Sequence, residues 1–201
     1  MPFITLINPQ VPAGKETEFL AAIEKAIPEM KAQPGVLGIS AGPIVAIDGK
    51  AISELKYIET VAFATREDEQ AFANSEWIQN KRKEMEARGV EPPRHALFAC
   101  SEFPAEKATH PFVRFSRITV SDESKIDDVR AAWKELMGAI GKDVWGAKSV
   151  EGEEIVGLGV CGFDSLEEAE AAFSKPEAKA ALDKYHALGQ CKDVVVKLTV
   201  Y

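Results

Sequence analysis

The sequence has no long apolar run and no concentration of positive charge. No stretch approaches the ~20 consecutive apolar residues that a membrane-spanning helix needs, and Met1–Ile4 has no basic segment followed by an apolar one. The formal net charge is −8, and we find no basic patch of the kind that binds nucleic acid or anionic lipid. We therefore expect a cytoplasmic protein with neither a membrane nor a nucleic acid as its partner.

Cysteine and histidine are also scarce. Cys100, Cys161 and Cys191 are scattered and show no C-x-x-C spacing, which is typical of reduced thiols rather than of a disulfide framework or a zinc site. The three histidines are equally dispersed, so we expect no metal site. The nucleophile elbow, the phosphate-binding loop and the dinucleotide fingerprint are absent. The sequence therefore predicts no bound cofactor.

What the sequence does contain is one pattern written twice. Gly35–Ile39 and Asp143–Ala147 share a Val-x-Gly-small core, at an offset of 108 residues. Phe63–Thr65 and Phe163–Ser165 repeat at an offset of 100 residues. A period of about one hundred residues is the size of a small domain and too long for a solenoid repeat. We therefore expect two copies of one supersecondary unit.

Each copy predicts the same order of elements: a strand, an amphipathic helix, a hairpin, a second helical region and a final strand. Asp48-Gly49 and Glu151-Gly152 mark the hairpins, since a tight two-residue turn needs positive φ. In the second copy, Ser174 should cap a restart of the second helical region. The outer strands and second helical regions fall at residues 3–8, 66–88 and 96–103, and at 112–120, 166–188 and 194–201. The order predicts an α+β protein of two ferredoxin-like βαββαβ repeats.

We divide the chain into a first unit at residues 1–104, a linker at 105–111 and a second unit at 112–201. The linker is polar and bracketed by prolines. A sheet with both helices on one face leaves its other face to be covered, and Ile155–Val160 is apolar on both faces. We therefore expect the two sheets to pack face to face as an intramolecular pseudo-dimer, with further homo-oligomerisation left open.

A second pattern runs from the third strand of each copy into its second helix: an apolar strand, an aromatic residue, a Ser or Thr cap and an acidic helix start. It is written in Leu158–Glu168 followed by Phe173, and more weakly in Val61–Glu67 followed by Phe72. In these residues the chain resembles the antibiotic biosynthesis monooxygenase domain of the dimeric α/β-barrel superfamily. The resemblance implies an intramolecular dimeric α/β barrel, with sites between the sheet and the helices of each unit.

We take three residues as catalytic candidates: Asn8, Trp77 and His95. Asn8 closes the first strand, where haem-degrading members of the family carry an Asn; the alternative is that Asn8 only shapes the turn before Pro9. Phe63 stands where that group carries a Trp, and the following helix contains no His. These differences argue against haem degradation.

The second helical region differs between the copies. Trp77, Asn80 and Glu84 stand where the second copy carries an apolar stripe. We therefore expect the first copy to line a wet pocket, with Asn80 and Glu84 binding the substrate. The alternative is a rotated helix that turns Ile78, Arg82 and Met85 inward.

The remaining candidates for substrate binding are Tyr185, His186 and Arg117. Tyr185 and His186 could bind and deprotonate a phenol or an acidic methylene. Adjacent helix residues diverge by about 100°, so the alternative is a packed Tyr beside a surface His. Arg114 and Arg117 should point to opposite faces of one strand, and one of them could pair with a ligand carboxylate or an internal acid.

The resemblance and these residues together lead us to expect a cofactor-independent monooxygenase acting on a small aromatic or polyketide-like molecule. The alternatives are a polyketide cyclase, or a non-catalytic barrel that binds a hydrophobic ligand or a protein partner, as stress-responsive members do. A cavity lined by Trp77, Asn80 and Tyr185 would favour the enzyme, and a cavity filled by side chains would favour the binding protein.

Overall fold

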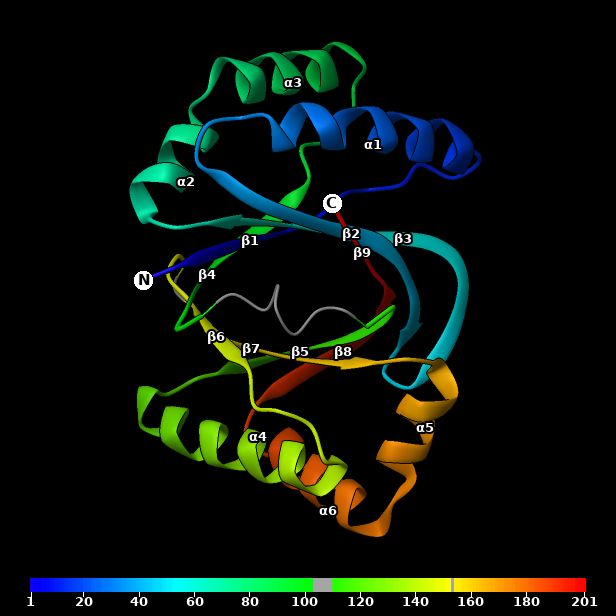
Figure 1. Cartoon of the computed structure of the whole chain (residues 1–201), viewed down its shortest axis with the longest axis vertical. Helices are drawn as coiled ribbons and strands as arrows, with labels where there is room; N and C mark the ends of the chain where they lie inside the picture. The colour runs from blue at the N-terminus through cyan, green and yellow to red at the C-terminus, as the bar shows by residue number, and fades with distance from the viewer. Residues whose placement is uncertain (103–109, 153) are drawn as a thin grey trace.

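A computed structural model of the chain describes residues 1–102, 110–152 and 154–201. In these residues, eight antiparallel strands close into a barrel, and helices cover two opposite sides of it (Figure 1). The first half contains β1 Phe3–Asn8, α1 Glu16–Lys31, β2 Val36–Ile47, β3 Lys50–Phe63, α2 Arg66–Ala73, α3 Glu76–Ala87 and β4 Arg94–Cys100. The second half contains β5 Phe112–Val120, a 3₁₀ turn Glu123–Lys125, α4 Ile126–Ile140, β6 Gly146–Ser149, β7 Ile155–Phe163, α5 Leu166–Ser174, α6 Pro176–His186, β8 Gln190–Lys197 and the short β9 Thr199–Val200.

The barrel closes through two seams between the halves. The first half contributes the strands β2, β3, β1 and β4 in spatial order, and the second contributes β6, β7, β5 and β8. At one seam β4 pairs with β6, where Phe98 lies opposite Ser149; at the other β2 pairs with β8, where Ile44 lies opposite Val196. The structure confirms the predicted closed barrel within one chain. The predicted linker lies mostly outside the described residues, and the domain boundaries stay a prediction.

Three apolar clusters form the core. The barrel interior is filled from both halves, for example by Phe98, Phe115 and Val196. A second cluster, which we call the first layer, lies between the first half's sheet and α1 to α3: Phe3, Ile27, Met30, Ile39, Ala41, Tyr57, Val61, Phe63, Phe72 and Leu97. The third, the second layer, lies between the other sheet and α4 to α6 and includes Trp133, Leu136, Phe163 and Tyr185. Two layers therefore flank a filled barrel.

The helix caps and the hairpin turns were partly predicted from the sequence. Asp48 and Gly49 both have positive φ and form the β2–β3 turn. The prediction for the second helical regions needs two corrections. Both regions are broken, since Ser75 accepts a hydrogen bond from the Ile78 N–H at 3.3 Å and starts α3. Ser174 does not cap α6, because its hydroxyl donates to the Glu170 carbonyl and Lys175 is the N-cap residue.

No helix in the described residues has both the length and the apolar composition to cross a membrane. The three cysteines are free thiols, with Cys100 and Cys161 buried and Cys191 partly buried.

The seam between β2 and β8 yields a stability prediction. A Cβ on Gly42 would overlap the backbone carbonyl of Lys197, so Gly42→Ala should force the end of β8 away from β2. We expect a loss of about 1–3 kcal/mol or more, typical of overpacking a rigid contact, measured by urea unfolding. Gly38→Ala on the same strand is the control, because its Cβ would meet nothing within 4 Å. Equal effects of the two substitutions would contradict the close approach.

Candidate functional site

Buried polar side chains in the described residues share one location. Each of them lies on a strand and faces the helices, while none faces the barrel interior. They are Thr5 and Glu59 in the first layer and Arg114, Ser116 and Asp193 in the second. Buried polar groups away from partners cost free energy and are concentrated at functional sites. The two layers, rather than the barrel interior, are therefore the candidate sites.

Glu59 is the centre of the first layer. It lies on β3, directly opposite Ile7 of β1 and Ala41 of β2, and is 4% exposed. Its carboxyl makes no hydrogen bond or ion pair with any residue that the structure describes. Burial raises the pKa of the Glu59 carboxyl to about 7, because the charged form is poorly solvated there. Such a group can take or give a proton near neutral pH.

Other polar groups surround Glu59 on the same face of the sheet. Thr5 lies on the neighbouring strand, and its buried hydroxyl has no hydrogen-bond partner among the described residues. Tyr57 lies two residues before Glu59, with its ring 5.5 Å from that of Phe19 on α1. His95 lies opposite Ile7, so His95, Ile7 and Glu59 form one row across three strands. The layer thus leads from exposed His95 to buried Glu59.

The second layer holds different residues at the matching positions. Phe3 lies opposite Phe63, and Phe112 lies opposite Phe163; counted from these pairs, Gly159 takes the place of Glu59. An indole takes the space above it, since a Cβ on Gly159 would overlap the Trp133 ring. The Trp133 ring lies 5.4 Å from that of Tyr185. The second layer is therefore filled where the first carries an acid.

The charges of the second layer are paired. Asp193 Oδ2 lies 2.7 Å from Arg114 Nη2 and 2.8 Å from His186 Nε2. The Arg114 guanidinium lies 4.1 Å from the centre of the Phe173 ring. Three buried polar atoms, Arg114 Nε, Ser116 Oγ and Asp193 Oδ1, have no partner among the described residues. The main ion pair is nevertheless compensated, as expected of a buried Arg and Asp that support structure.

The predicted substrate-binding residues of α3 lie outside the first layer. Asn80 and Glu84 are exposed, and α3 has no fully buried residue. Trp77 is half-buried: its Nε1–H donates to Glu29 Oε2 on α1 at 3.2 Å, and its ring lies 6.1 Å from that of Phe72. Trp77 thus joins α3 to α1, and Figure 1 shows α3 stacked outside α1 rather than on the sheet.

The remaining predicted residues are divided between other parts of the structure. Asn8 has the same strand parity as Ile4 and Leu6, which face the barrel interior, so Asn8 faces away from Glu59. Arg117 is exposed and lies 3.1 Å from Glu154, while Arg114 of the same strand is buried on the opposite face. Tyr185 is buried in the second layer, and burial raises its pKa. The structure therefore does not bring Trp77, Asn80 and Tyr185 together.

Glu59 was not among the predicted site residues, although the alternation of its strand indicates that it is buried. In Tyr57-Ile58-Glu59-Thr60-Val61, the acid alternates in phase with Tyr57 and Val61, both of which are buried in the first layer. A carboxyl in the buried phase of a strand conflicts with the local pattern, and such conflicts are expected at functional sites.

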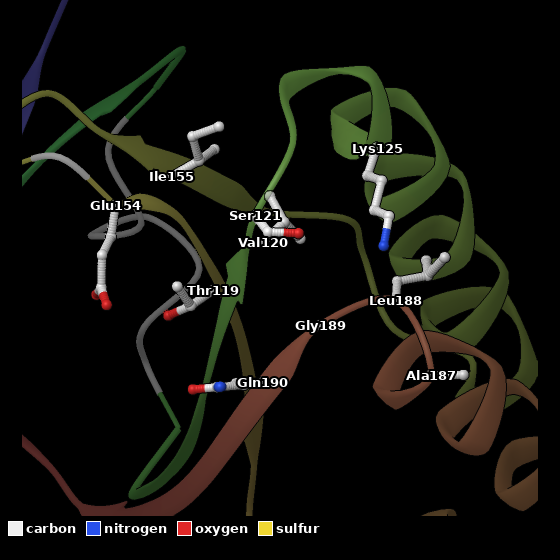
Figure 2. Close-up of a pocket in the computed structure, with 10 residues that line it drawn as sticks. All are labelled: Thr119, Val120, Ser121, Lys125, Glu154, Ile155, Ala187, Leu188, Gly189 and Gln190. Atoms are coloured by element: carbon white, nitrogen blue, oxygen red, sulfur yellow. The ribbon is translucent and has the colours of Figure 1, made fainter.

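A pocket of about 510 Å³ lies in the second half, outside both layers. Its lining comes from the end of β5, the starts of β7 and β8, the 3₁₀ turn and the loop that follows α6, as Figure 2 shows. The charged side chains in that lining, Lys125 and Glu154, are exposed. The pocket therefore offers no buried acid or base.

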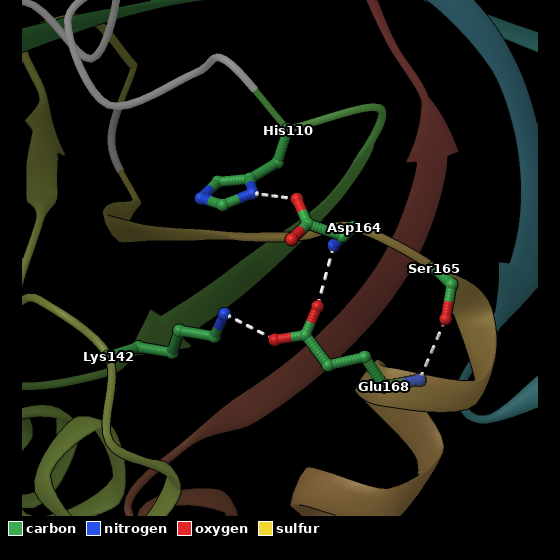
Figure 3. A network of polar contacts seen from close by, with 5 residues as sticks. All are labelled: His110, Lys142, Asp164, Ser165 and Glu168. Carbon is green, nitrogen blue, oxygen red and sulfur yellow. Dashed lines mark hydrogen bonds and ion pairs between the residues drawn. The ribbon is translucent and has the colours of Figure 1, made fainter.

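A second polar cluster, shown in Figure 3, fixes the start of the second half. His110 Nδ1 lies 2.7 Å from Asp164 Oδ1, and Glu168 accepts hydrogen bonds from the Asp164 N–H and from Lys142 Nζ. Ser165 caps α5 through the Glu168 N–H. The contacts of Glu168 with Ser165 and with the Asp164 N–H cap the start of α5. Within the described ranges, no group of three His, Cys, Asp or Glu side chains could hold a metal ion.

Glu59 yields a prediction on stability. Its folded pKa of about 7 lies above the ordinary value of 4.5, so the folded protein binds more protons than the unfolded chain between these pH values. Stability should therefore fall as pH rises from about 4.5 to about 7 and stay level above, by about 3 kcal/mol for such a shift. Glu59→Gln should remove this loss, and urea unfolding at pH 5 and pH 8 would measure it. Glu54→Gln, exposed on the same strand, should leave the pH dependence unchanged; a pH dependence kept in Glu59→Gln would show that Glu59 is not its source.

The sequence matches no family model and no curated protein sequence. Solved structures do match. A candidate monooxygenase from Fusobacterium nucleatum has a TM-score of 0.66 at 11% identity, over 99% of this chain and 93% of that one. An anthrone oxidase-like protein also has a TM-score of 0.66, at 12% identity, over 100% of this chain and 92% of that one.

A candidate monooxygenase from Lactobacillus acidophilus has a TM-score of 0.60 at 11% identity, over 99% of this chain and 95% of that one. At these identities the likeness concerns the fold alone. Nearly the whole length of each chain takes part in it, so the entire barrel, and not one half, is what they share. The chain has the fold of a dimeric α/β barrel, similar to that of monooxygenase-like proteins.

Proposed function

We propose that the chain is a cofactor-independent monooxygenase that oxidises a small aromatic molecule in the first layer, with Glu59 as the general base. The observation that carries the proposal is the state of Glu59: buried, without a partner, and with a pKa of about 7. A general base works best when its pKa lies near the operating pH. The names of the similar structures, monooxygenase and anthrone oxidase-like, support this reaction class.

The substrate that suits this site is a flat aromatic ketone or phenol with an acidic C–H. Apolar and aromatic side chains such as Phe19, Ile23 and Tyr57 belong to the cluster of the first layer, where Glu59 also lies, and they suit an aromatic ring. The polar groups nearby, Thr5 and Tyr57, could hold an oxygen of the substrate. Anthrone, a tricyclic ketone with an acidic methylene, is the simplest test molecule of this class.

The reaction can be written with Glu59 as the only protein acid or base. Its carboxylate takes a proton from the methylene and leaves a carbanion that is delocalised over the rings and the carbonyl oxygen. The carbanion gives electrons to O₂, and a C–O bond forms. The proton held by Glu59 returns to the peroxide, and loss of water leaves a new ketone. One methylene and one O₂ thus give one carbonyl and one water.

We also propose that the two halves are copies of one ferredoxin-like unit. Numbered by their order within each half, the strands lie side by side as 2, 3, 1 and 4 in both, which is the order of the split βαβ fold. In this interpretation the first copy keeps the site, and Trp133 together with Arg114 and Asp193 fills it in the second. The alternative function is a barrel that binds a hydrophobic ligand without turnover, and the apolar side chains of the first layer support it.

The kinetic test is anthrone oxidation, followed as O₂ uptake and anthraquinone formation. The kcat/KM of the natural sequence should rise with pH through a midpoint near 7, since the base must be ionised. Glu59→Gln should lower kcat by about 10²-fold or more, whereas Glu54→Gln should have little effect. Binding of anthrone without oxidation would favour the binding protein, and full activity of Glu59→Gln would exclude Glu59 as the base.

A further inference from the structure

The end of the second half crosses onto the sheet of the first. β9 pairs with β2, so that Val200 lies opposite Ser40 and Thr199 opposite Ala41. The Tyr201 N–H donates to the Ile39 carbonyl at 2.9 Å. This crossing depends on the close approach of Lys197 to Gly42. A segment of the second half therefore lies next to the first layer.

The register decides where the Tyr201 side chain points. Residues directly opposite on adjacent strands point to the same face, and Ile39 faces the first layer. Tyr201 therefore also faces the first layer. On the other side of β2, Tyr57 lies opposite Pro43 and Glu59 lies opposite Ala41. Pro43 and Ile39 flank Ala41, so the two tyrosine rings approach each other over Ala41, beside Glu59.

Direct contact between the two phenols agrees with this placement. Burial raises the pKa of Tyr57 to about 12, and the Tyr201 hydroxyl and the charge of Glu59 add to the shift. Tyr57 is 5% exposed, whereas Tyr201 is 40% exposed. The two tyrosines thus lie between the solvent and Glu59. The second layer does not repeat the inner part of this arrangement, because Gly157 and Gly159 stand at the positions of Tyr57 and Glu59.

We propose that Tyr201 is a substrate-binding residue of the first layer: its hydroxyl, which Tyr57 holds in place, donates its own O–H to the oxygen of an aromatic ketone or phenol whose C–H faces Glu59. The proposal rests on the proposed function for the reaction, though not for the contact between the two phenols. A Tyr hydroxyl that is fixed by a neighbour can donate to the oxygen on which charge develops when the carbanion forms. The second half would then supply a group that the first half needs.

The test compares Tyr201→Phe with Val200→Ala. Tyr201→Phe removes only the hydroxyl; Val200 is the neighbouring residue, exposed on the opposite face, and controls for changes in β9. In Tyr201→Phe we expect the kcat for anthrone to fall about tenfold with the pH midpoint near 7 unchanged, because Glu59 stays in place. Val200→Ala should keep the kcat. Equal kcat values in the two variants would overturn the proposal.

A second readout needs no turnover. The chain has three tyrosines, so their ionisation can be followed by ultraviolet absorbance, and Tyr201→Phe should lower the pKa of Tyr57. An unchanged Tyr57 titration would overturn the proposal, whatever the kinetics. If the natural sequence does not oxidise anthrone, the proposed reaction fails while the binding role of Tyr201 is still decided. Anaerobic anthrone binding, measured by tryptophan fluorescence, should be weaker in Tyr201→Phe than in Val200→Ala, and equal binding would refute the role.

Discussion

Closure of the barrel by two seams is the constraint on which the rest of the structure depends. Each sheet alone would leave two edges unpaired and one apolar face in water. Pairing of β4 with β6 and of β2 with β8 removes both problems at once, and residues from both halves then fill the interior. The buried side chains of this interior are apolar. Buried polar side chains are consequently found where the sheets meet the helices.

The two layers differ in how their buried polar groups are compensated. In the second, Arg114 and Asp193 neutralise each other, and Trp133 takes the space above Gly159. In the first, Glu59 has no opposite charge nearby, and burial raises the pKa of its carboxyl to about 7. Packing differs accordingly, since α6 buries Ala178, Ala181 and Tyr185 while α3 buries no residue completely. The isolated acid thus lies in the half whose outer helix, α3, has no buried residue.

The sequence predicted the elements better than the site. The strands Phe3–Asn8 and Phe112–Val120 have the predicted bounds, because alternation and β-branched residues are local signals. The position of α3 was not predictable from its stripe, since the stripe does not say whether a helix lies on the sheet or on another helix. Glu59 was not predicted for a related reason. Its burial without a partner depends on the register of three strands and on the helix above them, and neither is a local property of the sequence.

The difference between the two halves of the chain has a consequence for the burial of Glu59. In a symmetric dimer of identical subunits every residue occurs twice, so an isolated buried acid would weaken the assembly at two places. Here the matching position is Gly159, and the penalty, about 3 kcal/mol by the size of the pKa shift, arises once. The second half can therefore be packed tightly at this position. One barrel can thus contain both a destabilising buried acid in one half and the packing that compensates for it in the other.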